Sequence, residues 1–343
     1  MTVQDGRRGT AVPPSGPATA TSGTAPLRQG ARRRRSGPGR RRPRPQVNRG
    51  DWKPALLFLL PWIFGFAVFT AWPVLYTAYL SLTDYDVINA PTFIGLENYE
   101  RLAQDAGARR AMGNTLYYTA VQVPLYVLFS LFLALLLNQA GRASGVFRTV
   151  FFLPNMTPPV ATGVLLLLLF NGQDGLVNEV LGWFGISGPA WTTDPQWVKP
   201  GLILMSLLTI GGSVIILLAA LRNVPQELYD AAMVDGAGFW RRTWSVTVPM
   251  ISGPLFFVII VNTIAALQSF TEAYTAFFGV GTSTYSNDAA EFYAIHIFRE
   301  AFEFLRMGYA SALAWLLFVV IMIITAIQVV VSRRFVFYEG EGR

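Results

Sequence analysis

The sequence contains no cysteine and only one histidine, His296, among its 343 residues. Without cysteine the chain can form neither a disulfide nor a thiolate metal site. A lone histidine is far more often packed or solvated than a metal ligand, so we expect no metal site. A hydrolase or transferase would need a nucleophile with a base, or a cluster of metal ligands, and the sequence offers neither.

The sequence also lacks a Gly-x-x-x-x-Gly-Lys-Ser/Thr segment, the loop whose backbone amides hold nucleotide phosphates. We therefore expect no cofactor on this chain.

Charge is scarce, since 14% of the residues are charged whereas 52% are hydrophobic, which is typical of a membrane protein. About 20 apolar residues are needed for one helical crossing of a bilayer. Six blocks meet this length, and none shows the period-two alternation of a membrane β-barrel. The sequence predicts an all-α, polytopic protein with six transmembrane helices, at residues 55–79, 115–138, 149–170, 201–221, 254–278 and 310–331.

Proline interrupts the third block at Pro154, Pro158 and Pro159. Each proline removes a backbone donor, which lipid tolerates only where protein or a cavity satisfies the freed carbonyl. We expect this block to pack inside the bundle, either as a structural kink or as part of a pathway.

Lysine and arginine predict the orientation of the helices. The two termini and the loops after the second and fourth blocks carry 21 of the 27 basic residues. Because basic residues are retained on the cytoplasmic side, both termini and the loop at 222–250 are predicted to be cytoplasmic.

Residues 1–53 form a tail rich in Arg, Pro and Gly with few large apolar side chains, a composition typical of disorder. Its arginine runs at 32–35 and 40–42 could in principle bind nucleic acid. A cytoplasmic tail that touches anionic lipid is favoured, and no nucleic-acid partner is expected. The membrane domain is assigned to residues 54–335, and residues 336–343 form a short cytoplasmic tail.

The polar loop at 222–250 predicts two short helices. Pro225 suits the first turn of one helix, Asp235-Gly236 reads as a turn, and a second helix can begin near Phe239. From amphipathicity alone, such a hairpin could dock in a cleft of another protein or lie on the bilayer, and the two are equally supported.

The order of residues in this loop resembles the EAA motif of ABC importer permeases. That motif reads Glu-Ala-Ala, three residues, Gly, nine residues, Ile, one residue, Leu-Pro. Here Asp230-Ala231-Ala232 precedes Gly236 and Val246-Thr247-Val248-Pro249 at the full spacing, with Asp in place of Glu. The segments Phe93–Tyr99, Phe151–Pro154 and Val224–Tyr229 also look like landmarks of the MalF/UgpA-like carbohydrate permeases, in the order of that family.

The resemblance implies a type I ABC importer permease in a bacterial-type inner membrane. Its expected partners are a second homologous permease, two ATPase subunits and an extracytoplasmic solute-binding protein. The loop would be a coupling helix held by the ATPase. The residues expected to contact the ATPase are Glu227, Asp230, Ala231, Ala232, Asp235, Gly236 and Ala237.

The fifth block carries the candidate substrate site. Gln268, Glu272 and Thr275 follow i, i+4, i+7 spacing and predict a polar stripe on an apolar helix. An ionisable group such as Glu272 is costly in lipid and faces a bundle interior or a wet cavity. We predict that substrate contacts Asn262, Gln268, Phe270, Glu272 and Tyr274. Hydrogen bonds from Gln268 and Glu272 to neighbouring helices are the structural alternative.

These observations predict a permease subunit that forms half of the path for a sugar in an ATP-driven importer. Glycerol 3-phosphate or another small polar solute remains an alternative substrate. An ion-coupled secondary transporter with Glu272 as its coupling group is the alternative mechanism.

Overall fold

The computed structural model describes residues 52–141, 144–279 and 287–334. The predicted tails at 1–53 and 336–343 therefore lie almost entirely outside the described residues. The chain divides into two compact units, Met1–Leu60 and Pro61–Arg343. In the first unit, residues 52–60 are helical. Helix α1 continues across the boundary to Phe66, and every later element belongs to the second unit.

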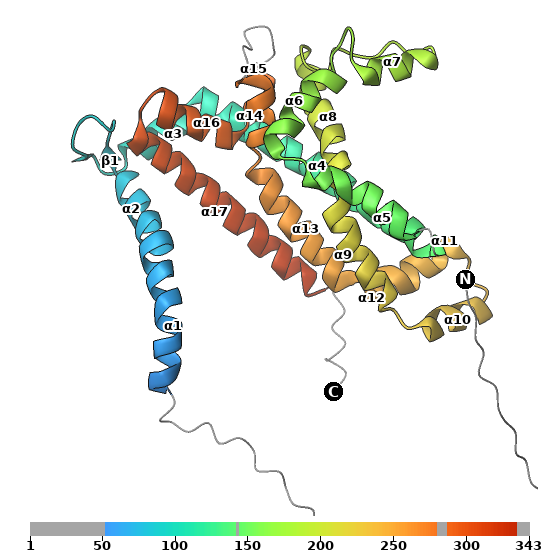
Figure 1. The fold of residues 1–343 in the computed structure, drawn as a ribbon. Coiled ribbons are helices and arrows are strands. Elements are labelled where there is room, and N and C mark those ends of the chain that lie inside the picture. The colour runs from blue at the N-terminus through green and yellow to red at the C-terminus, as the bar shows by residue number, and fades with distance from the viewer. Residues whose placement is uncertain (1–51, 142–143, 280–286, 335–343) are drawn as a thin grey trace, which may run out of the picture. The chain divides into compact units, whose positions relative to one another are not determined.

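The described residues are mostly helical, as predicted (Figure 1). The helices are α1 Trp52–Phe66, α2 Trp72–Leu80, α3 Glu97–Gln104, α4 Ala106–Gln139, α5 Ser144–Phe152, α6 Pro159–Leu169, α7 Leu176–Trp183, α8 Pro195–Ser206, α9 Gly211–Arg222, α10 Gln226–Val234, α11 Phe239–Arg242, α12 Val248–Met250, α13 Ser252–Leu267, α14 Thr271–Phe277, α15 Asn287–Ala290, α16 Tyr293–Phe298 and α17 Met307–Ser332. Two short strands, β1 Thr83–Asp84 and β2 Thr92–Phe93, pair antiparallel with Thr83 opposite Phe93.

Four helical stretches within the described residues are long and apolar enough to cross a membrane: Leu56–Leu80, Ala106–Gln139, Ser252–Phe277 and Met307–Ser332. Two further predicted blocks are broken. Ser144–Met156 and Pro159–Leu169 meet at 98°, and Pro195–Thr209 and Gly211–Arg222 meet at 51°. The described chain thus has four to six candidate spans, and the predicted number of six is reached if each bent pair is one span.

The break in the third block follows from its prolines. Pro154 lies in a 3₁₀ turn, Leu153–Met156, and Pro158 has extended ψ of 140° just before α6. Because Pro159 lacks an amide hydrogen and disfavours a helical residue before it, α6 must start anew there. Gly211 allows a close approach of α9, since a Cβ there would lie 2.8 Å from the Cα of Phe152.

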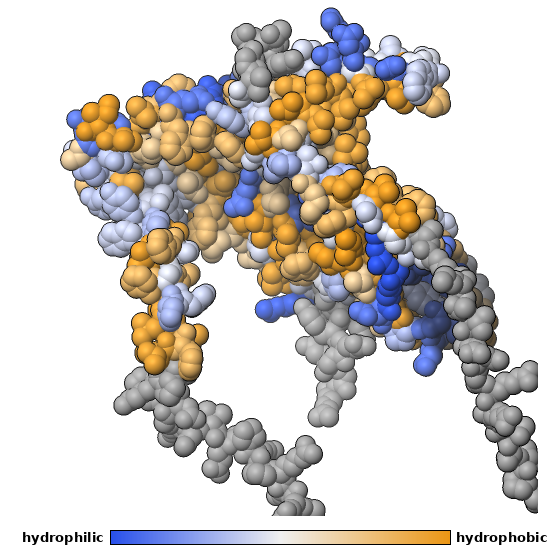
Figure 2. Space-filling model, in the orientation of Figure 1, coloured by the Kyte–Doolittle hydropathy of each residue, from blue (hydrophilic) through white to orange (hydrophobic). Residues whose placement is uncertain are grey.

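The central helix of the second unit is α4, which packs against α9 and α13, and α13 in turn packs against α17 (Figure 1). In the most apolar 18-residue stretch of α4, 44% of the residues are buried, whereas the same fraction in α17 is 6%. The apolar core runs through α4, α8, α9 and α13. Figure 2 shows apolar side chains over much of the helical surface, with hydrophilic ones gathered near α10 and α11. This distribution suits helices that face lipid along their length.

Helices α6 and α14 make an unusually close contact at Gly163. A Cβ on Gly163 would lie 2.7 Å from the carbonyl oxygen of Glu272 and 2.9 Å from the Cβ of Thr275. Carbon atoms do not approach that closely, so any side chain at this position would push the two backbones apart. Small residues of this kind are how membrane helices pack tightly.

A buried ionic cluster ties the start of α4 to α16 and α17. Asp105 caps α4 by accepting from the amide of Gly107 at 2.7 Å, and it also accepts from the hydroxyl of Tyr309 at 2.6 Å. The Nε2 of His296 lies 3.6 Å from Asp105, and its Nδ1 lies 3.1 Å from Glu291. Arg299 donates to the same Glu291 oxygen at 2.9 Å. The His296 ring therefore lies between the carboxylates of Asp105 and Glu291.

Burial lowers the pKa of His296, but the hydrogen bond with Glu291 and the charges of Glu291, Asp105 and Glu300 outweigh it, so the pKa is raised above 6.5. Burial by itself raises the pKa of a carboxyl group, but the pKa values of Glu291 and Asp105 are both lowered because other interactions outweigh burial. For Glu291 the His296 bond and the charges of His296 and Arg299 lower it overall. For Asp105 the hydroxyl of Tyr309, the backbone amides and the charge of His296 do so.

The described residues contain no group of three or more His, Cys, Asp or Glu side chains placed to hold a metal ion.

We predict that Gly163→Ala destabilises the fold by about 1–3 kcal/mol, because the new Cβ would separate α6 from α14. Gly113→Ala on α4 is the matched control, since a Cβ there meets nothing within 4 Å. Thermal unfolding of the full chain in detergent measures both. Equal unfolding temperatures for the two variants would show that the close contact is not a constraint.

We also predict that the protein is most stable at mildly acidic pH. A raised histidine pKa gives stability that is present below 6.5 and is lost as pH rises through the folded pKa. The lowered pKa of Glu291 gives stability that is present above 4.5 and is lost as pH falls through its folded value.

The unfolding temperature should therefore fall as pH rises from about 6 to about 8, and His296→Gln should flatten this slope. The chain has one histidine, so no other imidazole contributes. An unchanged slope in the variant would contradict the assignment.

Candidate functional site

A polar cavity of about 340 Å³ lies between α4, α6, α8, α13 and α14. From α4 it is lined by Tyr118, Gln122 and Tyr126, which follow i, i+4, i+8 spacing and so share one helix face. Other elements contribute further polar side chains. These are Asn155, Thr162, Ser206, Thr209, Asn262, Gln268, Ser269, Thr271 and Glu272.

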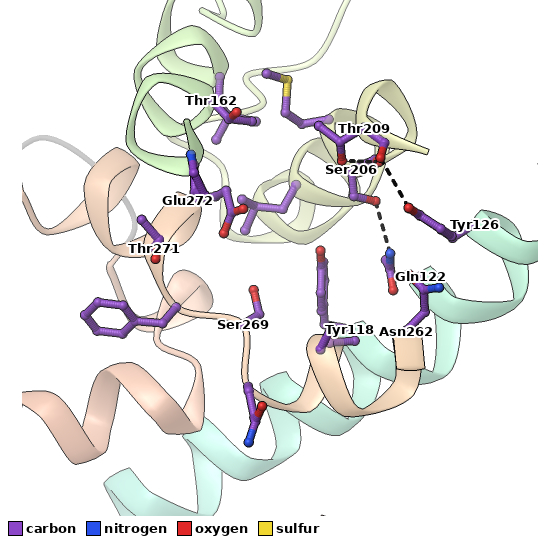
Figure 3. Close-up of a pocket in the computed structure, with 18 of the residues that line it drawn as sticks. Tyr118, Gln122, Tyr126, Thr162, Ser206, Thr209, Asn262, Ser269, Thr271 and Glu272 are labelled. Carbon is purple, nitrogen blue, oxygen red and sulfur yellow. Dashed lines mark hydrogen bonds between the residues drawn. The ribbon is translucent and has the colours of Figure 1, made fainter. Parts of the chain in front are cut away.

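Part of the polar lining is held by hydrogen bonds between helices. Gln122 donates to the hydroxyl of Ser206 at 3.4 Å, and Tyr126 donates to the carbonyl of Thr209 at 3.2 Å (Figure 3). Asn262 donates to its own helix at Val258 at 2.8 Å. The bonds of Gln122 and Tyr126 fix α4 against the end of α8.

One buried polar atom of the described residues that line the cavity lacks a partner. The amide oxygen of Gln122 is buried and has no hydrogen-bond partner among the described residues. Figure 3 shows Glu272, Ser269 and Thr271 on the side opposite Ser206, with Tyr118 between the two sides. A buried acceptor without a partner costs roughly 1–3 kcal/mol, so this arrangement favours water or a polar ligand in the cavity.

The structure brings together four of the five residues predicted to contact substrate, since Asn262, Gln268, Phe270 and Glu272 all line the cavity. Tyr274 does not line it. Its ring instead stacks on Phe270 at 4.9 Å and meets Phe298 at 5.1 Å. Contact between Tyr274 and substrate therefore stays a prediction.

The predicted polar stripe at i, i+4, i+7 was also wrong, because the helix is interrupted. α13 ends at Leu267, and Phe270 leaves helical geometry with φ −140° and ψ −65° before α14 begins at Thr271. The break lets α13 pack on α4 while α14 packs on α6. Gln268 to Glu272 consequently reach the cavity as a connected segment, whereas Thr275 contacts α6 at Gly163.

The cavity-lining face of α4 was not predicted, although the spacing of its polar residues in the sequence indicates it. Tyr118, Gln122 and Tyr126 recur every four residues within the second apolar block. Polar residues at this spacing in an apolar block indicate a helix face turned toward the bundle interior. The hydroxyl groups of Thr162, Ser206 and Thr209 carry no comparable periodic signal.

The loop at 222–250 has the predicted helix–bend–helix form. α10 begins after Pro225, Gly236 has the left-handed φ of 72°, and α11 begins at Phe239. The amide of Ala237 donates to the carbonyl of Ala232 at 2.9 Å, which closes the end of α10. Beyond α11 the backbone continues as a π-helical segment, Thr243–Thr247, rather than as a regular α-helix.

The first helix of the loop exposes both charge and apolar surface. Glu227, Asp230 and Asp235 are exposed, and Val234 is 89% exposed. Ala231 and Gly236 are also exposed, while Ala232 and Ala237 are half-buried. The hydroxyls of Tyr229 and Thr247 lie 3.1 Å apart, so α10 is tied to the returning segment of the loop.

The loop's two tryptophans line an apolar cavity of about 260 Å³, although Trp240 is 69% exposed and Trp244 62%. Trp240 and Trp244 line it together with Leu128, Leu135 and other residues of α4. The second half of the loop therefore rests against α4, and the first half projects from it.

Comparison with known proteins places these features in a family. Residues 126–337 match the family described as the binding-protein-dependent transport system inner membrane component. The probable ABC transporter permease protein YesP of Bacillus subtilis (strain 168) is 36% identical over 296 residues, covering 85% of this chain and 94% of YesP. The lactose transport system permease protein LacF of Rhizobium radiobacter is 33% identical, covering 81% of this chain and 93% of LacF.

A solved structure shares the fold. It is the crystal structure of a bacterial ABC transporter involved in the import of the acidic polysaccharide alginate. One of its chains superposes with a TM-score of 0.70 at 24% identity, covering 83% of this chain and 96% of that chain. The family match over most of the helical region, and relatives of this identity along nearly their whole length, lead to one conclusion: the chain belongs to the binding-protein-dependent transport system inner membrane components, the permeases of ABC transporters.

Proposed function

We propose that this chain forms half of the translocation path of an ATP-driven importer for a sugar, and that the polar cavity is its substrate site. The observation that carries the proposal is the cavity itself. It gathers amide, hydroxyl and carboxylate groups from α4, α8, α13 and α14, within otherwise apolar membrane segments. Such groups are costly in a membrane unless a wet path or a polar ligand needs them.

The chemistry of the cavity suits a neutral sugar. Hydroxyl groups of a sugar both donate and accept, and they match the Gln122 amide, the Glu272 carboxylate and the hydroxyls of Ser206 and Ser269. The rings of Tyr118 and Phe270 offer apolar faces for the C–H side of a sugar ring. Relatives named as permeases for lactose and for arabinooligosaccharides agree with this substrate class.

Glycerol 3-phosphate, the substrate named for the relative UgpA, fits the cavity less well. Its lining contains Glu272 but no lysine or arginine among the described residues. A phosphate dianion would thus meet a carboxylate without a compensating cation.

The loop at 222–250 supports coupling to a separate ATPase. Its projecting half exposes Asp230 and Val234 at the Gly236 bend, a surface that a cytoplasmic partner could enclose. The loop follows α9 and precedes α13, and both of these helices pack on α4. Movement of the loop can therefore reach the helix that carries Tyr118, Gln122 and Tyr126.

The remaining parts of the proposal concern the assembly. A second permease completes the path, two ATPase subunits bind ATP and Mg²⁺ beneath it, and an extracytoplasmic binding protein delivers the sugar. The six predicted blocks cross the inner membrane with the two bent pairs as single broken spans, and both termini are cytoplasmic. Glu227, Asp230, Ala231, Ala232, Asp235, Gly236 and Ala237 form the ATPase contact.

The transporter assembled with these partners in proteoliposomes should accumulate a sugar when ATP is supplied. Lactose, an arabinooligosaccharide and glycerol 3-phosphate are offered as labelled solutes. Gln122→Leu should lower sugar uptake by about tenfold, because one buried hydrogen bond is lost and an apolar group is left in its place.

Gln196→Leu is the matched control, since Gln196 is exposed on α8 away from the cavity. Uptake of glycerol 3-phosphate alone would refute the sugar assignment. Uptake that continues without the ATPase but stops when ion gradients are collapsed would instead favour an ion-coupled transporter.

In the loop, Asp230→Lys should lower ATP-driven uptake by at least about fivefold, because the new charge repels the basic group expected on the ATPase. Gly236→Pro should do the same, because proline cannot adopt a φ of 72°. Recovery of the ATPase with an affinity-tagged chain provides a second readout.

Asp174→Lys makes the same charge change at an exposed position far along the chain from the loop and should leave uptake unchanged. Normal uptake and normal ATPase recovery in both loop variants would rule out the coupling role.

A further inference from the structure

Five aromatic rings form a continuous series that begins at the wall of the polar cavity. This aromatic ladder consists of Phe270, Tyr274, Phe278, Phe298 and Phe302. Phe270 lines the cavity and lies 5.2 Å from Phe298, measured between ring centroids. Phe298 also lies 5.1 Å from Tyr274 and 5.0 Å from Phe302. Phe278 stacks on Tyr274 at 6.0 Å.

The ladder leads from the cavity to the protein surface. Phe270 and Tyr274 belong to the α13–α14 span, whereas Phe298 ends α16 and Phe302 lies in the π-helical segment Arg299–Glu303. Phe270, Tyr274, Phe278 and Phe298 are half-buried, whereas Phe302 at the far end of the series is 61% exposed. Residues 293–303 lie outside all the candidate membrane spans. The exposed end of the ladder is therefore beyond the apolar helices.

Charged groups accompany the ladder at this end. The guanidinium of Arg299 lies 5.5 Å from the Phe278 ring centroid and donates to Glu303 at 2.9 Å. Glu303 is itself partly exposed. Lipid is a poor occupant for this surface, because charged side chains are costly in hydrocarbon. The guanidinium of Arg299 and the carboxylate of Glu303 accompany aromatic faces here, so the surface instead suits a ligand with both hydroxyl groups and C–H faces.

We propose that the aromatic ladder is a sugar-binding track that guides pyranose rings from the outer surface into the cavity. The C–H face of a pyranose stacks on an aromatic ring, and Arg299 and Glu303 bind hydroxyls at its edge. Because successive rings are about 5 Å apart, a sugar can move from Phe302 to Phe298 and then to Phe270 while it keeps aromatic contact. The assignment as an approach path rests on the proposed function, whereas sugar binding by the ladder can be measured without transport.

Saturation-transfer NMR on the purified full chain tests the proposal directly. The protein is held in an amphipathic polymer that contains neither sugar nor aromatic groups, and aromatic protons are irradiated. Lactose and maltopentaose are the pyranose probes, and glycerol 3-phosphate is the acyclic comparison. Both sugars should show transfer to their C–H protons, and glycerol 3-phosphate should show little.

Phe298→Ala with Phe302→Ala should reduce the transfer to both sugars by at least about threefold, while Phe302→Trp keeps it. Phe184→Ala is the matched control, since Phe184 is 76% exposed at the end of α7 and belongs to neither the ladder nor the cavity lining. The proposal is overturned by equal transfer in the double variant, by an equal loss in Phe184→Ala, or by no transfer in the unaltered protein.

Transport separates this inference from the proposed function. ATP-driven sugar uptake that is the same in the double variant and in the unaltered protein would remove the track and leave the importer assignment intact. Transfer that depends on Phe298 and Phe302, combined with no sugar uptake by the complete assembly, would keep the sugar-binding surface and remove the importer assignment.

Discussion

Polar side chains on apolar membrane helices must meet one another, water or a ligand, because lipid offers no hydrogen bonds. This constraint organises the second unit of the chain. Gln122 and Tyr126 on α4, Ser206 and Thr209 at the end of α8, and Glu272 on α14 come from distant parts of the sequence and face one cavity. The surfaces that remain on the outside of the helices are largely apolar.

Broken helices are what give this cavity its shape. The α5–α6 and α8–α9 pairs bend by 98° and 51°, and the α13–α14 helix is interrupted after Leu267. Each break ends a helix beside the cavity and brings polar side chains there. The tight contact at Gly163 then holds α14 against α6, so the segment carrying Glu272 has a defined position. Cavity geometry and helix packing thus depend on the same few residues.

The two ends of the second unit differ in how they are held. Near the start of α4, His296 and Arg299 are fixed among Asp105, Glu291 and Glu303, and the aromatic ladder passes beside this cluster. The projecting half of the 222–250 loop has few such ties and leaves Asp230 and Val234 exposed. This difference agrees with the proposed importer, in which substrate would enter at the rigid side and the ATPase would bind at the open side.

The sequence by itself determined the apolar blocks, the helical class and the form of the loop, including the Gly236 bend, because these depend on local composition, spacing and backbone freedom. It also singled out Asn262, Gln268, Phe270 and Glu272. Only the tertiary structure decided that Gln122 of α4 meets Ser206 of α8, that the helix breaks before Phe270, and that Tyr274 joins the aromatic ladder. Periodicity describes one helix at a time, whereas these outcomes depend on which helix faces pack together.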